Sequence, residues 1–255
     1  MIDLHSHILP GIDDGAQTLE ESLMMARTAV KEGINQIVAT PHHLTTRYTN
    51  TKASILKQVE DFNEHLKQEG IPLEVLPGQE ARLSADFWEA YRQGEILPVN
   101  VASGYLFIEL PNLDVPGYTE KIIFDLQKEG FKPIIVHPER NQVLQKQPDL
   151  LYRMVRNGAF TQVTAASLIG KFGKDAKKFA FQLIKSNLTH LVASDAHDTK
   201  KRGFYMKAAY DSIGRKFDNS LVYQYMENAH YVLNGEMVLT DRPTPIRKKK
   251  GIGIF

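Results

Sequence analysis

Short apolar stretches alternate with helical patterns along most of the chain, and this alternation is the feature that most constrains the fold. The stretches expected as strands are residues 1–6, 34–40, 73–76, 105–110, 133–137, 159–164 and 188–194. Because each connection between parallel strands needs a crossover of its own, usually a helix, about seven βα units in series predict a parallel sheet. The expected class is therefore α/β.

Capping residues and glycines mark where the expected helices begin and end. Thr18 with Glu21 forms a capping box, and Gly33 can end the helix that follows. The later helices are expected over residues 55–66, 122–128, 150–156 and 175–185. Each of them falls between two of the expected strands, which fits the βα pattern.

The C-terminal part of the chain breaks the alternation. Residues 203–234 have a helical pattern with an aromatic stripe that includes Tyr210 and Tyr225, and we expect this stripe to pack against the barrel rather than bind a partner. The basic run 247–250 is expected to be a solvated end, with docking to a partner as the alternative. The sequence thus predicts one domain over residues 1–255, with a core at 1–202 and a helical, basic extension at 203–255.

Side chains that can bind metals lie at the ends of six of the seven expected strands. They are His5 and His7, His42, Glu80, Glu109, His137, and Asp195 with His197. The carboxyl ends of strands in a parallel α/β barrel meet at one face, where such enzymes build their sites. Two residues apart on a strand, His5 and His7 point to the same side and can chelate one ion. Six independent structural residues would rarely fall this way, so the pattern predicts a metal site.

The mixture of imidazole and carboxylate indicates which metals suit the site. Without sulfur ligands, it favours manganese, iron or zinc, with magnesium as a possible substitute. Adding Asp14 gives nine ligands, which fit two or three ions with Glu80 as a plausible bridge. From the residues alone, Asp13 and Asp14 compete for one role. The histidines expected outside the site are His43, His65, His190 and His230.

Composition excludes several other chemistries. The 255 residues contain no cysteine, so no thiolate nucleophile or sulfur-held metal is available. Lys and Arg number 31 against 30 Asp and Glu, and this balance gives no global field for nucleic acid. No targeting segment and no apolar run of about 20 residues is evident, so a cytoplasmic protein without a transmembrane segment is expected.

These motifs resemble those of the PHP superfamily, named for polymerase and histidinol phosphatase. Its four-motif signature matches the His5-Ser6-His7 opening, His42 and Glu80, His137, and the Asp195-Ala196-His197 ending. Within the superfamily, the longer runs 5–16, 40–43 and 137–140 are similar to the bacterial tyrosine-protein phosphatases of capsule and exopolysaccharide operons. The resemblance extends from Met1 to at least Arg202.

The resemblance implies a distorted, TIM-like (βα)7-type PHP barrel. It also implies a manganese-dependent trinuclear centre that hydrolyses phosphotyrosine on a partner such as a bacterial tyrosine kinase, and a role in exopolysaccharide or capsule synthesis. The family's metal ligands carry over onto the nine residues named above, and this favours Asp14 over Asp13. The family's phosphate-binding arginines match Arg140 and Arg202.

The expected mechanism needs no side-chain nucleophile, because clustered divalent ions activate water for in-line attack on phosphorus. A tyrosine leaving group, with a pKa of about 10, needs less protonation than an alkyl alcohol. If a general acid operates, the candidates are Asp14, His42 and His197.

Other functions remain as alternatives. The nearest is histidinol-phosphate phosphatase or another PHP phosphoesterase with the same barrel and metals. A non-catalytic interaction protein would need a decayed site, which the complete ligand set argues against. An amidohydrolase-type deaminase usually needs fewer acidic ligands, and a nuclease would need a basic groove.

Overall fold

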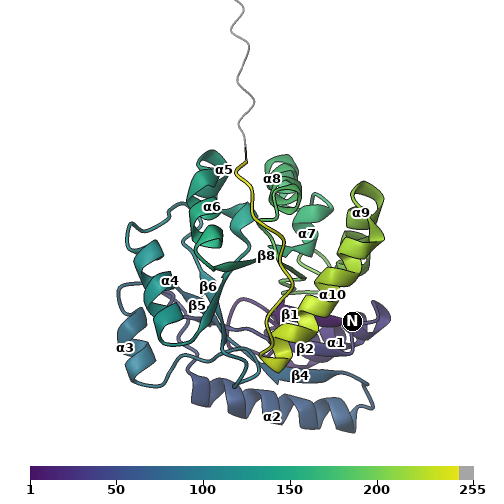
Figure 1. Ribbon diagram of the computed structural model, residues 1–255. Helices are drawn as coiled ribbons and strands as arrows, with labels where there is room; N and C mark the ends of the chain where they lie inside the picture. The colour runs from purple at the N-terminus through teal and green to yellow at the C-terminus, as the bar shows by residue number, and fades with distance from the viewer. Residues whose placement is uncertain (247–255) are drawn as a thin grey trace, which may run out of the picture.

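Parallel strands lie at the centre of the molecule and helices surround them, in the computed structural model, which describes residues 1–246 (Figure 1). The strands are β1 (Ile2–Ser6), β2 (Gln36–Ala39), β3 (His42–His43), β4 (Glu74–Pro77), β5 (Glu80–Arg82), β6 (Tyr105–Glu109), β7 (Lys132–Val136), β8 (Phe160–Thr164) and β9 (Leu191–Ala193). The helices are α1 (Leu19–Lys31), α2 (Lys52–Gln68), α3 (Phe87–Arg92), α4 (Thr119–Lys128), the 3₁₀ turn η1 (Pro138–Arg140), α5 (Gln142–Lys146), α6 (Pro148–Arg156), α7 (Ala165–Leu168), α8 (Gly173–Lys185), α9 (Met206–Lys216) and α10 (Asn219–Asn234). The α/β class and the parallel pairing are confirmed.

The second and third expected strands are each interrupted, which divides the sheet into two ladders. One ladder has the order β1-β2-β4 and the other has the order β3-β5-β6-β7-β8-β9. Pro41 lies in the first interruption and lacks the N–H that a continuous ladder would need. Gly78 lies in the second, where an added Cβ would come within 2.5 Å of Val38 Cγ1. The strands therefore break at these two residues, and each continues in the other ladder.

The first and last strands close the ring. Ser6 and Ala196 form a parallel bridge. The His7 N–H donates to the Ala196 carbonyl over 2.8 Å, and the Asp195 N–H donates to the His5 carbonyl over 2.8 Å. With the two interrupted strands each counted as one, seven strands complete a distorted barrel, as the sequence predicts. We call the join between β1 and β9 the seam.

The barrel has a small interior core and a larger core beneath the helices. Alternate residues of one strand divide between them: Tyr105 and Phe107 on β6 belong to the interior, and Leu106 and Ile108 to the outer layer. Helix α10 packs against β1 and β9 and adds Val232 to the interior core, and it crosses the barrel in Figure 1. The C-terminal helices are therefore part of the barrel packing.

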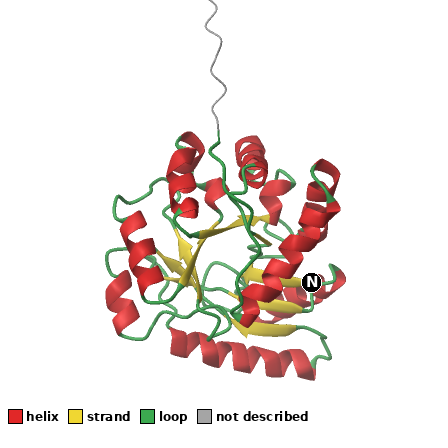
Figure 2. Cartoon of the chain, in the orientation of Figure 1, coloured by secondary structure: helices red, strands yellow, loops and turns green. Residues whose placement is uncertain are grey.

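Several sequence predictions are corrected by the structure. The expected helical tail is two helices, because the chain leaves the helix at Phe217 and restarts after the Asp218 cap. Short helices α3, α5 and α7 were not predicted, and the helices and loops between the strands are shown in Figure 2. Within the aromatic stripe, Tyr210 and Tyr225 are buried in the core as expected, whereas Tyr223 is exposed and does not pack against the barrel. The basic run 247–250 lies outside the described residues. Within residues 1–246, no helix is both long and apolar enough to cross a bilayer.

Candidate metal centre

The strand register brings the predicted ligands together at one end of the barrel. His42 on β3 pairs with Glu80 on β5, and Arg82 on β5 pairs with Glu109 on β6. Three overlapping groups have ligand atoms within 4.8 Å of one another. They are His7, Asp14, His42 and His197; His5, His7 and Glu80; and His42, Glu80 and Glu109.

The last two predicted ligands touch these groups directly. His137 Nε2 lies 2.6 Å from Glu80 Oε1. Asp195 Oδ1 lies 3.5 Å from His5 Nε2 and 3.4 Å from His7 Nε2. The structure thus places all nine side chains in one connected cluster, and the cluster draws on every strand of the barrel except β8.

Three histidines are oriented by acceptors that lie behind them. The Nδ1–H of His5 donates to Gln162 Oε1 over 2.9 Å, and the Nδ1–H of His7 donates to Asp13 Oδ2 over 2.6 Å. The Nδ1–H of His197 donates to the Asp195 carbonyl over 3.0 Å. Each bond fixes a tautomer in which Nε2 keeps a free lone pair. All three rings therefore present Nε2 to the centre.

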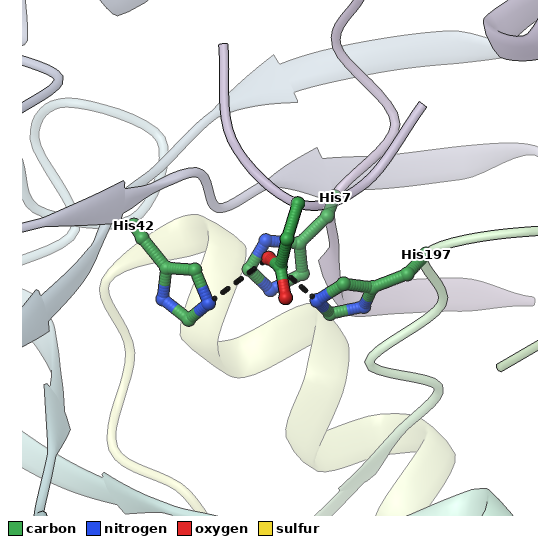
Figure 3. Close-up of side chains that lie close together, drawn as sticks. His7, His42 and His197 are labelled. Carbon is green, nitrogen blue, oxygen red and sulfur yellow. Dashed lines mark ion pairs between the residues drawn. The ribbon is translucent and has the colours of Figure 1, made fainter. Parts of the chain in front are cut away.

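Asp14 bridges two of the histidines. Its Oδ1 lies 3.3 Å from His42 Nε2 and 3.2 Å from His197 Nε2. Figure 3 shows the rings of His7, His42 and His197 facing one another, with dashed lines at these ion pairs. Asp13 is instead buried behind His7, where it also accepts from the Gly15 N–H over 2.9 Å. The two aspartates that compete in the sequence therefore occupy different places.

Several buried atoms in the centre lack hydrogen-bond partners. Within the described chain these include Glu80 Oε2, Asp195 Oδ1 and His197 Nε2. His5 Nε2 and His7 Nε2 lie only 3.3 Å apart, although two lone pairs that face each other repel. Buried polar groups normally find partners, and exceptions of this kind often indicate an ion. The donor set is imidazole and carboxylate, so the residues fit divalent cations such as manganese, iron or zinc.

The charges of the protein side chains also favour cations. Burial opposes ionisation of Glu80, but the imidazoles of His42, His5 and His137 outweigh burial and lower the pKa of this carboxyl well below its usual range. Asp195 is likewise buried, and Arg140 with His197 lowers its pKa well below the usual range. Burial lowers the pKa of His137 and of His197 to about 4. Despite burial, neighbouring carboxylates raise the pKa of His7 well above its usual range and that of His42 to about 10. Bound divalent ions would take the place of those protons, because metal ligands are ionised carboxylates and neutral imidazoles.

Two candidate ligands occupy strained backbone positions. His137 has φ of 36° and Asp195 has φ of 52°, both in the left-handed region that non-glycine residues rarely adopt. Such conformations cluster at functional sites, where the surrounding structure holds them. Glu139 anchors the turn after His137, because its Oε1 accepts from the Thr164 N–H and the Ser167 hydroxyl over 3.0 and 2.7 Å.

Three arginines line the cleft above the cluster. Arg140 Nη1 lies 2.6 Å from Asp195 Oδ2, and Arg202 lies 3.3 Å from Asp14 and 3.4 Å from Asp195. Arg82 was not predicted; its Nε and Nη2 donate to the two oxygens of Glu109, each over 2.7 Å. Its position two residues after Glu80 on one strand was the available signal. The cleft has a volume of about 700 Å³.

The histidines expected outside the centre do lie outside it. His43 is buried, and burial lowers its pKa to about 4. His190 is buried against β8, where it accepts from the Thr161 N–H over 3.0 Å. His65 is half-buried on α2. Gln162, at the strand end without an ionisable ligand, was missed as the residue that orients His5.

Comparisons with known proteins agree with the resemblance seen in the motifs. The family described as capsular polysaccharide synthesis, CpsB/CapC, matches residues 1–234. The tyrosine-protein phosphatase YwqE of Bacillus subtilis is 42% identical over 255 residues, which is all of both chains. The CapC protein of Staphylococcus aureus is 37% identical over 262 residues, again with full coverage of both chains.

A solved structure gives the same result for the fold. It comes from work on YwqE of Bacillus subtilis and CpsB of Streptococcus pneumoniae, described as unique metal-dependent tyrosine phosphatases. It superposes with a TM-score of 0.94 at 42% identity and covers 97% of this chain and 100% of the other. The motifs, the barrel and these matches lead to one assignment: the chain belongs to the CpsB/CapC family.

Proposed function

We propose that this protein is a metal-dependent protein-tyrosine phosphatase acting in capsule or exopolysaccharide synthesis. The observation that carries the proposal is the cluster of nine candidate ligands, in which several buried atoms lack hydrogen-bond partners, beneath a cleft lined by arginines. The family and its tyrosine phosphatase members support the substrate class. One domain would do this work, with residues 1–202 as its core and 203–255 as its extension.

The metal ligands in this proposal fall into three groups. His5, His7, Glu80 and Asp195 would hold one ion, and Asp14, His42 and His197 a second. A third would lie near Glu80, Glu109 and His137, so that Glu80 is shared between sites. We propose manganese as the native metal, with iron, zinc or magnesium as possible substitutes. Bound divalent ions would lower the pKa of water and offset the charge of the phosphoryl oxygens.

The reaction is hydrolysis of the phosphate ester. The oxygen of water bonds to phosphorus, the bond from phosphorus to the tyrosyl oxygen breaks, and the products are inorganic phosphate and tyrosine. Arg140 and Arg202 would present planar forks of donors to the non-bridging oxygens, as guanidinium groups do in other phosphate sites. Both arginines contact Asp195, which holds their guanidinium groups near the site. On binding, the substrate phosphate would accept some of the N–H groups that now face Asp195.

The substrates would be phosphotyrosine proteins, among them a cognate bacterial tyrosine kinase, and the site of action would be the cytoplasm. Neither nucleic acid nor a membrane is required by this function. Arginines and metal ions would also suit histidinol phosphate, which is the second candidate because a cleft of about 700 Å³ can take a small substrate as well.

A turnover panel separates these functions. Protein loaded with manganese, iron, zinc or magnesium is assayed on a phosphotyrosine peptide, a phosphoserine peptide and histidinol phosphate. We expect the highest kcat/KM with phosphotyrosine, loss of activity with a chelator, and full activity after thiol alkylation, because the chain has no cysteine. Preference for histidinol phosphate would overturn the assignment.

A paired substitution tests the metal centre itself. His5→Ala with His7→Ala removes two imidazoles whose Nε2 atoms lie 3.3 Å apart, and should abolish both bound metal and turnover. His65→Ala, on α2 and away from the cleft, is the matched control and should retain both. Normal metal content and turnover in the double variant would show that the metal mechanism is wrong.

A further inference from the structure

A second cavity adjoins the cleft, between α5 and the start of α8. Its volume is about 470 Å³, in the range of about 300–1,000 Å³ typical of ligand pockets. It shares Arg140, Gln142 and Phe172 with the cleft, so the two cavities have a common wall. We call it the α5–α8 pocket. A peptide with its phosphotyrosine in the cleft would pass beside it.

The shared wall is held in place by contacts on both sides. The Arg140 guanidinium lies 4.9 Å from the centre of the Phe172 ring, and its Nη1 lies 2.6 Å from Asp195. Arg140 and Phe172 therefore form a fixed boundary between the pocket and the cleft.

The remaining lining of the pocket carries a free cation. Lys146 at the end of α5 is exposed, and it forms no ion pair within residues 1–246. Asp175 on the first turn of α8 is the one carboxylate among the lining residues of the described chain, and of the two lining cations Arg140 is already paired with Asp195. Gln142 and Gln145 add amide groups. Lys146 is therefore the lining cation left to pair with an anion.

Further lysines lie next to residues that line the cleft: Lys171 precedes Phe172, and Lys200 and Lys201 share a smaller cavity with Asp14 and Glu21. Lys171 lies 5.3 Å from the centre of the Tyr205 ring, and the Tyr205 hydroxyl donates to the Lys200 carbonyl over 2.7 Å. Lys200 and Lys201 are both exposed. Asp198 lies among them but accepts three backbone N–H groups, from residues 200 to 202.

We propose that the α5–α8 pocket binds an acidic side chain that flanks the phosphotyrosine of the substrate, with Lys146 as its partner. This inference rests on the proposed phosphatase function and adds a substrate preference to it. Lysine is a flexible point charge, so it would accept aspartate or glutamate without a strict geometry. The preference should be about two- to five-fold in KM, the strength of one exposed ion pair.

The test uses phosphotyrosine peptides that carry Glu, Ala or Lys at each of three positions on either side of the phosphotyrosine. Metal-loaded wild type should show the lowest KM for Glu at one or two adjoining positions, and added salt should weaken that preference. Lys146→Glu should reverse it, so that the Lys peptide becomes the better substrate. Misfolding cannot produce such a reversal.

Lys128→Glu is the matched control, because Lys128 is exposed at the end of α4 and faces the opposite end of the barrel. It should keep the preference of wild type. Equal KM for the three peptides, or a preference that survives Lys146→Glu, would overturn the inference while the phosphatase assignment stands. Failure to hydrolyse free phosphotyrosine and every peptide would instead reject the proposed function.

Discussion

Histidine orientation in the centre depends on acceptor atoms that would not themselves bind an ion. Gln162, Asp13 and the Asp195 carbonyl each accept an Nδ1–H from a candidate ligand, and each leaves Nε2 free. The Gln162 amide is itself held, because its Nε2 donates to the Val163 carbonyl over 2.9 Å. Changes at these acceptors should therefore act on metal affinity before they act on the fold.

Gln162→Leu removes the acceptor behind His5 and keeps a side chain of similar size. We expect metal affinity to fall about 10- to 100-fold, the usual cost of losing such a partner. Gln162→Glu retains an acceptor and should hold metal much better than the leucine variant. Competition with a chelator, followed by metal analysis, measures both. Equal affinity in the two variants would contradict a positioning role for Gln162.

His190 should make stability depend on pH, because burial lowers its pKa from 6.5 to about 4. Between these values the unfolded chain binds the proton and the folded chain does not, so the free energy of unfolding falls as pH falls. His190→Asn keeps an acceptor for the Thr161 N–H and removes this titration. Its free energy of unfolding should fall less steeply between pH 6.5 and 4, by roughly 1.4 kcal/mol per pH unit.

Urea unfolding of both proteins at half-unit steps of pH gives the comparison. At pH 8, where His190 is neutral in both states, the two slopes should agree, and this serves as the control. Parallel curves over the whole range would show that His190 titrates normally in the folded protein.

The sequence could predict which side chains come together in the centre, but it could not supply their surroundings. The choice between Asp13 and Asp14 depends on a loop whose path no pattern specifies. In the structure Asp13 Oδ2 lies 2.6 Å from His7 Nδ1, whereas the Asp14 side chain is exposed at the centre. The spacing of Arg82 from Glu80 indicates the face of the strand, but only the register shows that Arg82 lies opposite Glu109.

At the scale of elements, breaks in two strands set the positions of the candidate ligands that follow them. The strands that carry His42 and Glu80 break at Pro41 and at Gly78, and the pieces beyond the breaks join the second ladder. The loop after β1 is equally constrained, because Gly15 packs on the backbone of His7: an added Cβ would lie 2.0 Å from the His7 carbonyl oxygen. Close approach of backbone to backbone thus sets the position of Asp14.

Gly15→Ala should therefore push the loop away from β1. We expect the free energy of unfolding to fall by about 1–3 kcal/mol, as for overpacked sites, and metal content to fall with it. Gly117→Ala is the control, since nothing lies within 4 Å of its added Cβ, and it should change stability by less than about 0.5 kcal/mol. Denaturant unfolding and metal analysis of both variants check this. Wild-type values for Gly15→Ala would contradict the close packing.

Element types could be predicted because apolar periodicity and glycine stops are local signals. The interruption at Gly78 could not, since it depends on how closely Val38 of the neighbouring strand packs. Helices α3, α5 and α7 have only four to six residues, too few for a period to show.

At the scale of the whole molecule, the centre joins parts of the chain that are far apart in sequence. His5 and His7 lie on one side of the seam and Asp195 and His197 on the other, and few backbone hydrogen bonds link β1 to the residues after β9. Ions held by both sides would strengthen the seam, so metal binding and barrel stability should be coupled.

Removal of metal should accordingly lower Tm. An ion present at 100 times its Kd adds about 2.7 kcal/mol, which corresponds to a Tm shift on the order of 5–10 °C for a chain of this size. Differential scanning calorimetry of chelated and manganese-loaded protein measures the shift. The His5→Ala, His7→Ala double variant should show almost none. An unchanged Tm in wild type, with loss of metal verified, would refute the coupling.

The seam also has a consequence for synthesis. The ribosome delivers His7 early and His197 roughly 190 residues later, an interval of roughly 10 to 40 s at the usual rate of elongation. A nascent chain therefore holds only part of its ligand set for most of translation, and a chain truncated before residue 195 never acquires the rest. A complete metal centre, and with it the ability to remove phosphate from other proteins, becomes a property only of chains extended past His197.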